Sequence, residues 1–157
     1  MAQSKNYSNG GSMTEKQKRI KKAGDMFISG YNCAQSTAAP FADLVGMDEN
    51  TMLKASSGFG GGVVKLKDVC GVVSGIALVY GLSQDKDLSD ADTKTKFYED
   101  GQKLVSKFTE KNNTNICAEL LDNFEKNPPA DEPYASKPCL KLVEDGASVL
   151  CDYFGIE

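Results

Sequence analysis

The sequence predicts an all-α fold, a single-domain bundle of six or seven helices. Apolar residues recur at helical spacing from Thr14 onward. Residues 69–82 form a nearly continuous apolar run that is shorter than the about 20 residues needed to span a bilayer. No second convincing strand exists to pair with this run, so we interpret it as a buried central helix. We expect one helical cysteine-motif domain over residues 14–157, preceded by a polar, glycine-rich disordered tail over residues 1–13.

Three helices are predicted in the first third of the chain. Residues 14–17 have the pattern of a capping box before the first helix. Asn32 caps the second, which Pro40 kinks or ends early. A third helix runs from Asp48 through Ala55, and the glycine-dense residues 58–62 then interrupt helical structure. The first helix has a basic face that we interpret as solvated because the total charge is negative; its members are Lys16, Lys18, Arg19, Lys21 and Lys22.

The central helix and a long amphipathic helix come next. Asp68 can cap the central helix. Within it, Gly71 and Gly75 stand one turn apart, where they would let another backbone approach closely. Ser89 or Asp90 opens the long helix.

Two further helices flank a long loop. Thr114 or Asn115 caps the first of them. Residues 126–138 contain four prolines, so we expect a loop of the length that often carries function. The last helix runs from about Cys139 to Phe154.

Composition excludes several classes of function. With 18 basic and 22 acidic residues the net charge is −4, which disfavours nucleic acid and anionic membranes as partners. The chain has no histidine, so Ser-His and Cys-His catalytic pairs, histidine-ligated zinc and c-type haem attachment are excluded. An odd number of cysteines and the lack of an apolar leader predict a reducing, cytoplasmic location without membrane insertion.

The cysteines are the candidate catalytic residues. Cys151 lies well inside the last predicted helix, and we interpret it as filler. The other four fall in the first turns of predicted helices, where free backbone N–H groups and the helix dipole stabilise a thiolate and lower its pKa: Cys33, Cys70, Cys117 and Cys139. No Cys-x-x-Cys pair exists, which argues against a ferredoxin-type run, a zinc ribbon and a thioredoxin motif.

Glycines near these cysteines are the candidate cofactor-binding residues. Consecutive glycines let backbone N–H groups approach an anion, a cluster sulfur or a substrate beside Cys70. They can equally serve only to turn the chain tightly between two helices, and both interpretations stay open. The residues are Gly60, Gly61, Gly62 and Gly71.

Five segments together resemble a known family. They are YNCAQS at 31–36, FGGG at 59–62, CGVVSG at 70–75, CAELL at 117–121 and Cys139. The chain is similar, from Lys18 to Phe154, to the C-GCAxxG-C-C family of redox-active proteins. The resemblance implies a redox role for the same four cysteines and, because members are often encoded near transporters, an electron donor or acceptor linked to a transporter. Val72 departs from the family motif, which has alanine at this position. The larger valine side chain would leave less room for any group that approaches the start of the central helix.

Three functions are compatible with these residues. The first is thiol–disulfide exchange, which needs no cofactor: Cys70 attacks, Cys33 resolves, and Cys117 and Cys139 form a second pair. The second is an iron–sulfur cluster or soft metal ion held by the same four thiolates. The third is a helical scaffold whose cysteines are inert and buried. The sequence leaves the oligomeric state, the substrate and the electron donor open.

Overall fold

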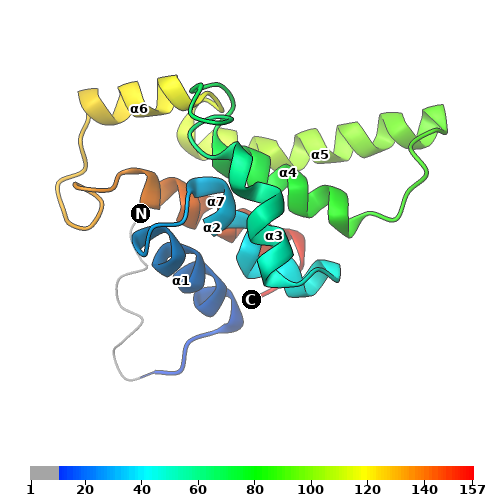
Figure 1. Cartoon of the computed structure of the whole chain (residues 1–157), viewed down its shortest axis with the longest axis horizontal. Coiled ribbons are helices and arrows are strands. Elements are labelled where there is room, and N and C mark those ends of the chain that lie inside the picture. Colours follow the sequence, from blue (N-terminus) through cyan, green and yellow to red (C-terminus); the bar gives the residue numbers. More distant parts are fainter. Residues whose placement is uncertain (1–10) are drawn as a thin grey trace.

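The structure is a computed structural model that describes residues 11–157, and it confirms the all-α single-domain fold (Figure 1). Within that range there is no β-strand, only an isolated antiparallel bridge between Val69 and Ile116. The predicted tail falls mainly on residues 1–10, which lie outside the described part. No described helix is long and apolar enough to cross a membrane. The helices are α1 (Glu15–Ile28), α2 (Cys33–Ala38), α3 (Glu49–Ser56), α4 (Gly71–Ser83), α5 (Ala91–Asn112), α6 (Cys117–Lys126) and α7 (Cys139–Tyr153), with 3-10 turns η2 (Ala39–Val45) and η3 (Ser57–Phe59).

The predicted apolar helix is α4, and it lies at the centre of the fold. It packs against α2, α5, α7 and η2. Val72, Ile76 and Val79 are fully buried in the core. A Cβ atom on Gly75 would lie 3.1 Å from the carbonyl oxygen of Ala34 in α2, so this glycine permits the close approach of two helices that the sequence predicted.

Local capping signals set the first three helices as predicted. Thr14 forms a reciprocal capping box with Gln17 at the start of α1, and Asn32 forms one at the start of α2. The predicted end at Pro40 is confirmed, because α2 stops at Ala38 and continues as the 3-10 turn η2. Asp48 caps α3, accepting a hydrogen bond from the backbone N–H of Thr51.

Two predicted caps are wrong. Cys70 itself is the N-cap of α4, so Asp68 does not cap it. Ile116 is the N-cap of α6, in place of Thr114 or Asn115. A short bridge pairs the chain around Val69 with that around Ile116, and the N–H groups of Cys70 and Cys117 donate across it instead of to a local cap.

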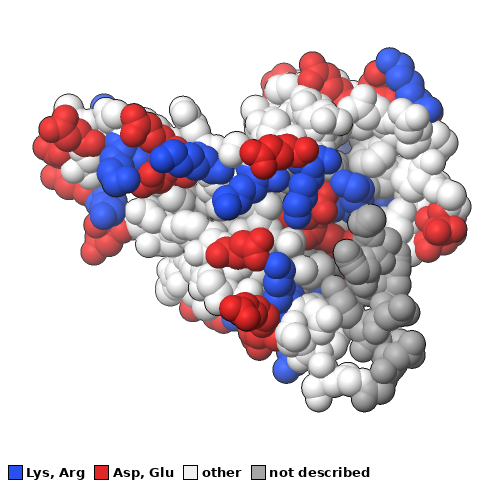
Figure 2. Space-filling model, turned by 180° about the vertical axis from the view of Figure 1, so that it is seen from behind, with Lys and Arg blue, Asp and Glu red and all other residues white. Residues whose placement is uncertain are grey.

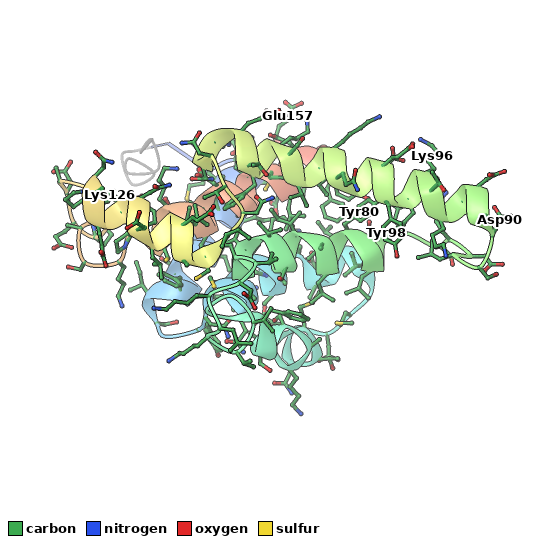
Figure 3. All side chains as sticks on the ribbon, turned by 90° about the horizontal axis from the view of Figure 1, so that it is seen from above. Tyr80, Asp90, Lys96, Tyr98, Lys126 and Glu157 are labelled. Carbon is green, nitrogen blue, oxygen red and sulfur yellow. The ribbon has the colours of Figure 1, made fainter. Side chains whose placement is uncertain are left out.

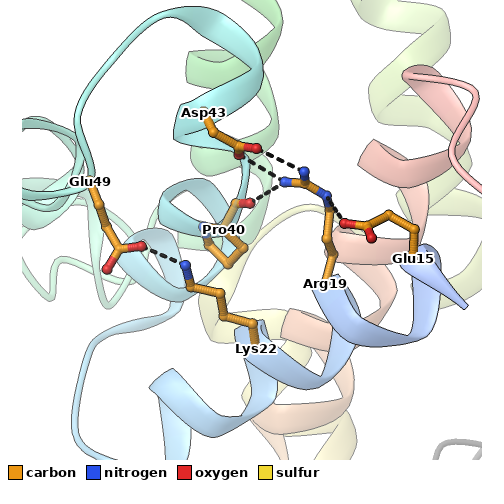
Figure 4. Close-up of polar contacts among 6 residues, drawn as sticks. All are labelled: Glu15, Arg19, Lys22, Pro40, Asp43 and Glu49. Carbon is orange, nitrogen blue, oxygen red and sulfur yellow. Dashed lines mark hydrogen bonds and ion pairs between the residues drawn. The ribbon is translucent and has the colours of Figure 1, made fainter. Parts of the chain in front are cut away.

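The basic face of α1 is paired with carboxylates. Arg19 binds both carboxylate oxygens of Asp43 at 2.9 and 2.8 Å, donates to the carbonyl of Pro40 at 2.6 Å and contacts Glu15 (Figure 4). Lys22 pairs with Glu49 at 2.6 Å. The reverse face of the molecule also shows basic and acidic residues interspersed (Figure 2). These pairs agree with a solvated, ion-paired surface on α1.

Helices α5 and α6 reach opposite ends of the molecule. Asp90, which caps α5, lies at one end, and Lys126, the last residue of α6, lies near the other (Figure 3). The loop predicted over 126–138 is present between α6 and α7. Helix α7 buries an apolar stripe in the core, consisting of Leu142, Val143, Val149 and Leu150.

Candidate functional site

One cavity brings together the four cysteines that the sequence singled out. It has a volume of about 210 Å³. Each thiol reaches it from a different helix start, because each cysteine is either the first residue of its helix or the N-cap: Cys33 of α2, Cys70 of α4, Cys117 of α6 and Cys139 of α7. All four are free thiols. Residues separated by up to 106 positions (139 − 33) therefore share one chamber.

Backbone pairing fixes Cys70 relative to Cys117. The N–H of Cys70 donates to the carbonyl of Asn115 at 2.8 Å, and the N–H of Cys117 donates to the carbonyl of Asp68 at 2.7 Å. These two hydrogen bonds enclose the bridge between Val69 and Ile116. The start of α6 is thus tied directly to the start of α4.

A glycine contact brings Cys33 against the neighbour of Cys70. A Cβ atom placed on Gly71 would lie 2.4 Å from the Sγ atom of Cys33, so the thiol occupies the space that any larger residue would fill. Asn32 holds Cys33 at the helix start, because its side chain accepts from the N–H of Gln35 and donates to the carbonyl of Ser57. The sulfur of Cys33 and the backbone of α4 are therefore in direct contact.

Burial opposes the predicted activation of Cys70, Cys117 and Cys139. It raises the pKa of Cys70 from the usual 9.0 to about 12, although the backbone N–H groups of Val72 and Val73 act in the opposite direction. Burial also raises the pKa of Cys139 to about 11, and it raises the pKa of Cys117. At Cys70 the backbone amides of the helix start are present, but loss of hydration outweighs them.

Charge on Cys33 would act on all three of its neighbours. After burial, a thiolate at Cys33 is a further cause that raises the pKa of Cys70, Cys117 and Cys139. Cys33 is half-buried, whereas Cys70 is only 4% exposed. Low exposure and a raised pKa both argue against Cys70 as the attacking thiol, and the roles of the four cysteines stay predictions.

Comparison with protein families agrees with this arrangement of cysteines. The family model described as "Putative redox-active protein (C_GCAxxG_C_C)" matches residues 31–153, which include all four. The chain belongs to this C_GCAxxG_C_C family. Searches of curated proteins and of solved structures gave no significant match.

In this C_GCAxxG_C_C protein the departure at Val72 does not narrow the cavity. Val72 is fully buried and does not line it. A Cβ atom on Gly146 of α7 would lie only 2.3 Å from the Cγ1 atom of Val72. The glycine in α7 therefore makes room for the larger side chain. The expected obstruction is replaced by packing of α4 against α7.

The glycine run makes a compact left-handed turn beside the cavity. Gly61 and Gly62 have φ angles of +66° and +73°, and Val63, Val64 and Lys65 continue with positive φ. A Cβ on Gly62 would lie 2.8 Å from the Cβ of Cys117. These glycines therefore turn the chain tightly, as one of the two interpretations expected. Binding of a cofactor by them stays a prediction.

A second set of glycine contacts closes this turn against α2 and the cavity. A Cβ on Gly60 would lie 2.5 Å from the amide group of Asn32. Gly61 and Gly71 line the cavity itself. Close packing therefore explains why these positions lack side chains.

The apolar residues that line the cavity were not predicted from the sequence as part of the site. Leu120 and Leu121 follow Cys117 by one helical turn and line the cavity, as do Phe27 and Leu142. The spacing of three and four residues from Cys117 was the signal that could have identified the two leucines. Cys151 is fully buried in the core, away from the cavity, as its interpretation as filler predicted.

The geometry does not present a set of metal ligands. Among residues 11–157, no group of three or more Cys, Asp or Glu side chains is placed to hold a metal ion. Binding of a metal ion or cluster by the four thiolates stays a prediction. Two-sulfur chemistry needs only one pair in contact.

Proposed function

We propose that this protein works by thiol–disulfide exchange, with Cys33 as the attacking thiol and Cys70 as its resolving partner. The observation that carries the proposal is that four thiols from four helices line one cavity and Cys33 lies against Gly71, next to Cys70. Membership in a family described as redox-active supports the same function.

The exchange proceeds in two balanced steps. The Cys33 thiolate attacks one sulfur of a substrate disulfide, forming a mixed disulfide and releasing the first substrate thiol. The Cys70 thiol then loses its proton and attacks the Cys33 sulfur, which releases the second substrate thiol. Two protein thiols are oxidised to a disulfide, and the substrate disulfide is reduced to two thiols.

Cys117 and Cys139 serve as the second pair. Both line the same cavity as Cys33 and Cys70, and charge on Cys117 raises the pKa of Cys139, as burial does more strongly. Exchange of this pair with the Cys33–Cys70 disulfide returns the first pair to thiols and leaves a disulfide between Cys117 and Cys139. An external thiol donor then reduces that disulfide.

An equilibrium titration tests the proposal. The full chain is equilibrated with mixtures of reduced and oxidised dithiothreitol, quenched with acid and mapped by mass spectrometry. We expect loss of two hydrogen atoms per disulfide and a disulfide joining Cys33 to Cys70. Cys33→Ser should abolish that disulfide, whereas Cys151→Ser should retain it. The proposal is wrong if no disulfide forms among the four cavity cysteines, or if Cys151→Ser removes the transition as completely as Cys33→Ser.

A further inference from the structure

Among the residues that the structure describes, no charged side chain lines the cysteine cavity. Apart from the thiols and two glycines, its lining consists of apolar residues and one amide, that of Asn32. This amide is already engaged with Gln35 and Ser57. The cation whose charge acts on Cys117 is Lys67, which is exposed and does not line the cavity. A charged group that entered would therefore lose its hydration without gaining a counter-charge.

The cavity is also small. Its volume of about 210 Å³ is below the about 300–1,000 Å³ that encloses a drug-sized ligand. Leu120 and Leu142 are buried at 3% and 2% exposure, so the wall cannot be widened without loss of core packing. A large peptide disulfide could not be enclosed.

We propose that the substrate of this site is a small, uncharged disulfide, whose two sulfur atoms enter the cavity with short apolar arms. The inference rests on the proposed exchange function and narrows its substrate class. The electrons come from Cys33 and Cys70, which become a disulfide, and the substrate leaves as two neutral thiols. Selection arises because neutral arms shed water at low cost, whereas ammonium or carboxylate arms find no partner at Leu120, Leu121 or Phe27.

Three symmetric disulfides of similar size provide the test. Hydroxyethyl disulfide is neutral, cystamine is a dication and dithiodiglycolate is a dianion. The rate at which each oxidises Cys33 in the reduced full chain is measured by quenching and mass spectrometry. Each rate of Cys33 oxidation is divided by the rate measured with the same chain unfolded in guanidinium chloride. This normalisation removes differences in intrinsic reactivity among the three disulfides.

The predicted order differs from what net charge alone would give. A chain of net charge −4 attracts a dication over long range, so overall charge would rank cystamine first. Desolvation in the cavity instead predicts that hydroxyethyl disulfide has the highest normalised rate, by roughly tenfold over both ions. Equal normalised rates, or a faster ion, would overturn the inference. The exchange function is tested separately by the dithiothreitol equilibrium, whose outcome does not depend on substrate charge.

A charge placed in the wall gives a second readout. Leu121 is half-buried and lines the cavity, so Leu121→Arg should raise the normalised rate with dithiodiglycolate relative to hydroxyethyl disulfide. Leu82→Arg adds the same charge at an exposed position near the end of α4 and should leave that ratio unchanged. If the two variants shift the ratio equally, the cavity wall does not select for charge. Should Leu121→Arg fail to fold by circular dichroism, the charge series on the unaltered chain still decides the inference.

Discussion

Gly71 is the position where one added methyl group should disturb the cysteine cavity most directly. It is buried and is the first residue of α4. A Cβ there would lie 2.4 Å from the Sγ of Cys33, 2.9 Å from the carbonyl oxygen of Phe59 and 3.2 Å from the backbone nitrogen of Ala34. Two of these three atoms are backbone, so rotation of the Cys33 side chain alone cannot relieve the contact. Gly71→Ala must separate α4 from the start of α2.

The matched control lies in the same helix. A Cβ on Gly81 meets nothing within 4 Å. Replacing glycine by alanine inside a helix stabilises by about 0.5–1 kcal/mol, and this gain applies to both positions. Overpacking costs about 1–3 kcal/mol and applies only to Gly71. We therefore expect Gly81→Ala to be more stable than Gly71→Ala by about 1–3 kcal/mol, because the helix gain largely cancels in the comparison.

Urea unfolding followed by circular dichroism measures this difference through the transition midpoint. Alkylation of Cys33 in the folded state gives a second readout, and it should be faster in Gly71→Ala because the thiol is displaced from α4. If Gly71→Ala proves as stable as Gly81→Ala, with unchanged alkylation of Cys33, then Cys33 does not lie against α4 and the geometry argued for the first disulfide is wrong.

Two further predictions concern burial and capping. The neutral Cys70 thiol, whose pKa burial raises from 9.0 to about 12, contributes stability that is present below about pH 9 and lost as the pH rises toward 12, up to about 4 kcal/mol. Urea midpoints should therefore fall more steeply between about pH 8 and pH 10.5 in the unaltered chain than in Cys70→Ala; parallel curves would contradict the burial argument. Asn32→Ala and Thr14→Ala each remove a capping box and should each cost about 1 kcal/mol, but only Asn32→Ala should change the alkylation rate of Cys33, and equal rates in both variants would show that this cap does not position the thiol.

Most helices could be predicted because their signals are local. The capping residues Thr14, Asn32 and Asp48 lie at the starts where the sequence placed them, and Pro40 ends α2. The apolar run that forms α4 could be predicted as a buried helix from its composition alone, without knowledge of the elements that pack against it. Helical spacing from Thr37 and Phe41 also predicts a core-facing position for Leu44, which is instead 38% exposed because it lies in the 3-10 turn η2, where α-helical spacing does not continue.

The segment between Gly60 and Cys70 could not be predicted from local patterns. Val63 and Val64 have φ angles of +67° and +41°, in a region that β-branched residues rarely adopt. Backbone hydrogen bonds compensate: the N–H of Val64 donates to the carbonyl of Gly58 at 2.8 Å, and that of Asp68 donates to Gly62 at 3.0 Å. Residue preferences predict turns from local sequence, and here tertiary contacts of this segment with α6 prevail over those preferences.

The chemistry of the thiols shows where the sequence argument was incomplete. A helix start stabilises a nearby anion by about 0.3–1 kcal/mol, up to ~2 in favourable geometry, which is worth about one pKa unit. Burial raises a thiol pKa by up to about 3–5 units, so it prevails wherever the helix starts meet inside the core, as at Cys70. Helix position could be inferred from sequence, but burial could not, because it depends on Leu120, Leu142 and Phe27 arriving from three other places in the chain.

The same balance separates the two sulfur chemistries proposed for this cavity. A dithiol and its disulfide are both uncharged, so conversion of one into the other transfers no net charge into an apolar chamber. Four thiolates around a metal ion or cluster leave net negative charge, and no Lys or Arg side chain of residues 11–157 lines the wall to offset it. In the proposed exchange Cys70 is the resolving thiol, which ionises only transiently while it displaces the substrate sulfur from Cys33.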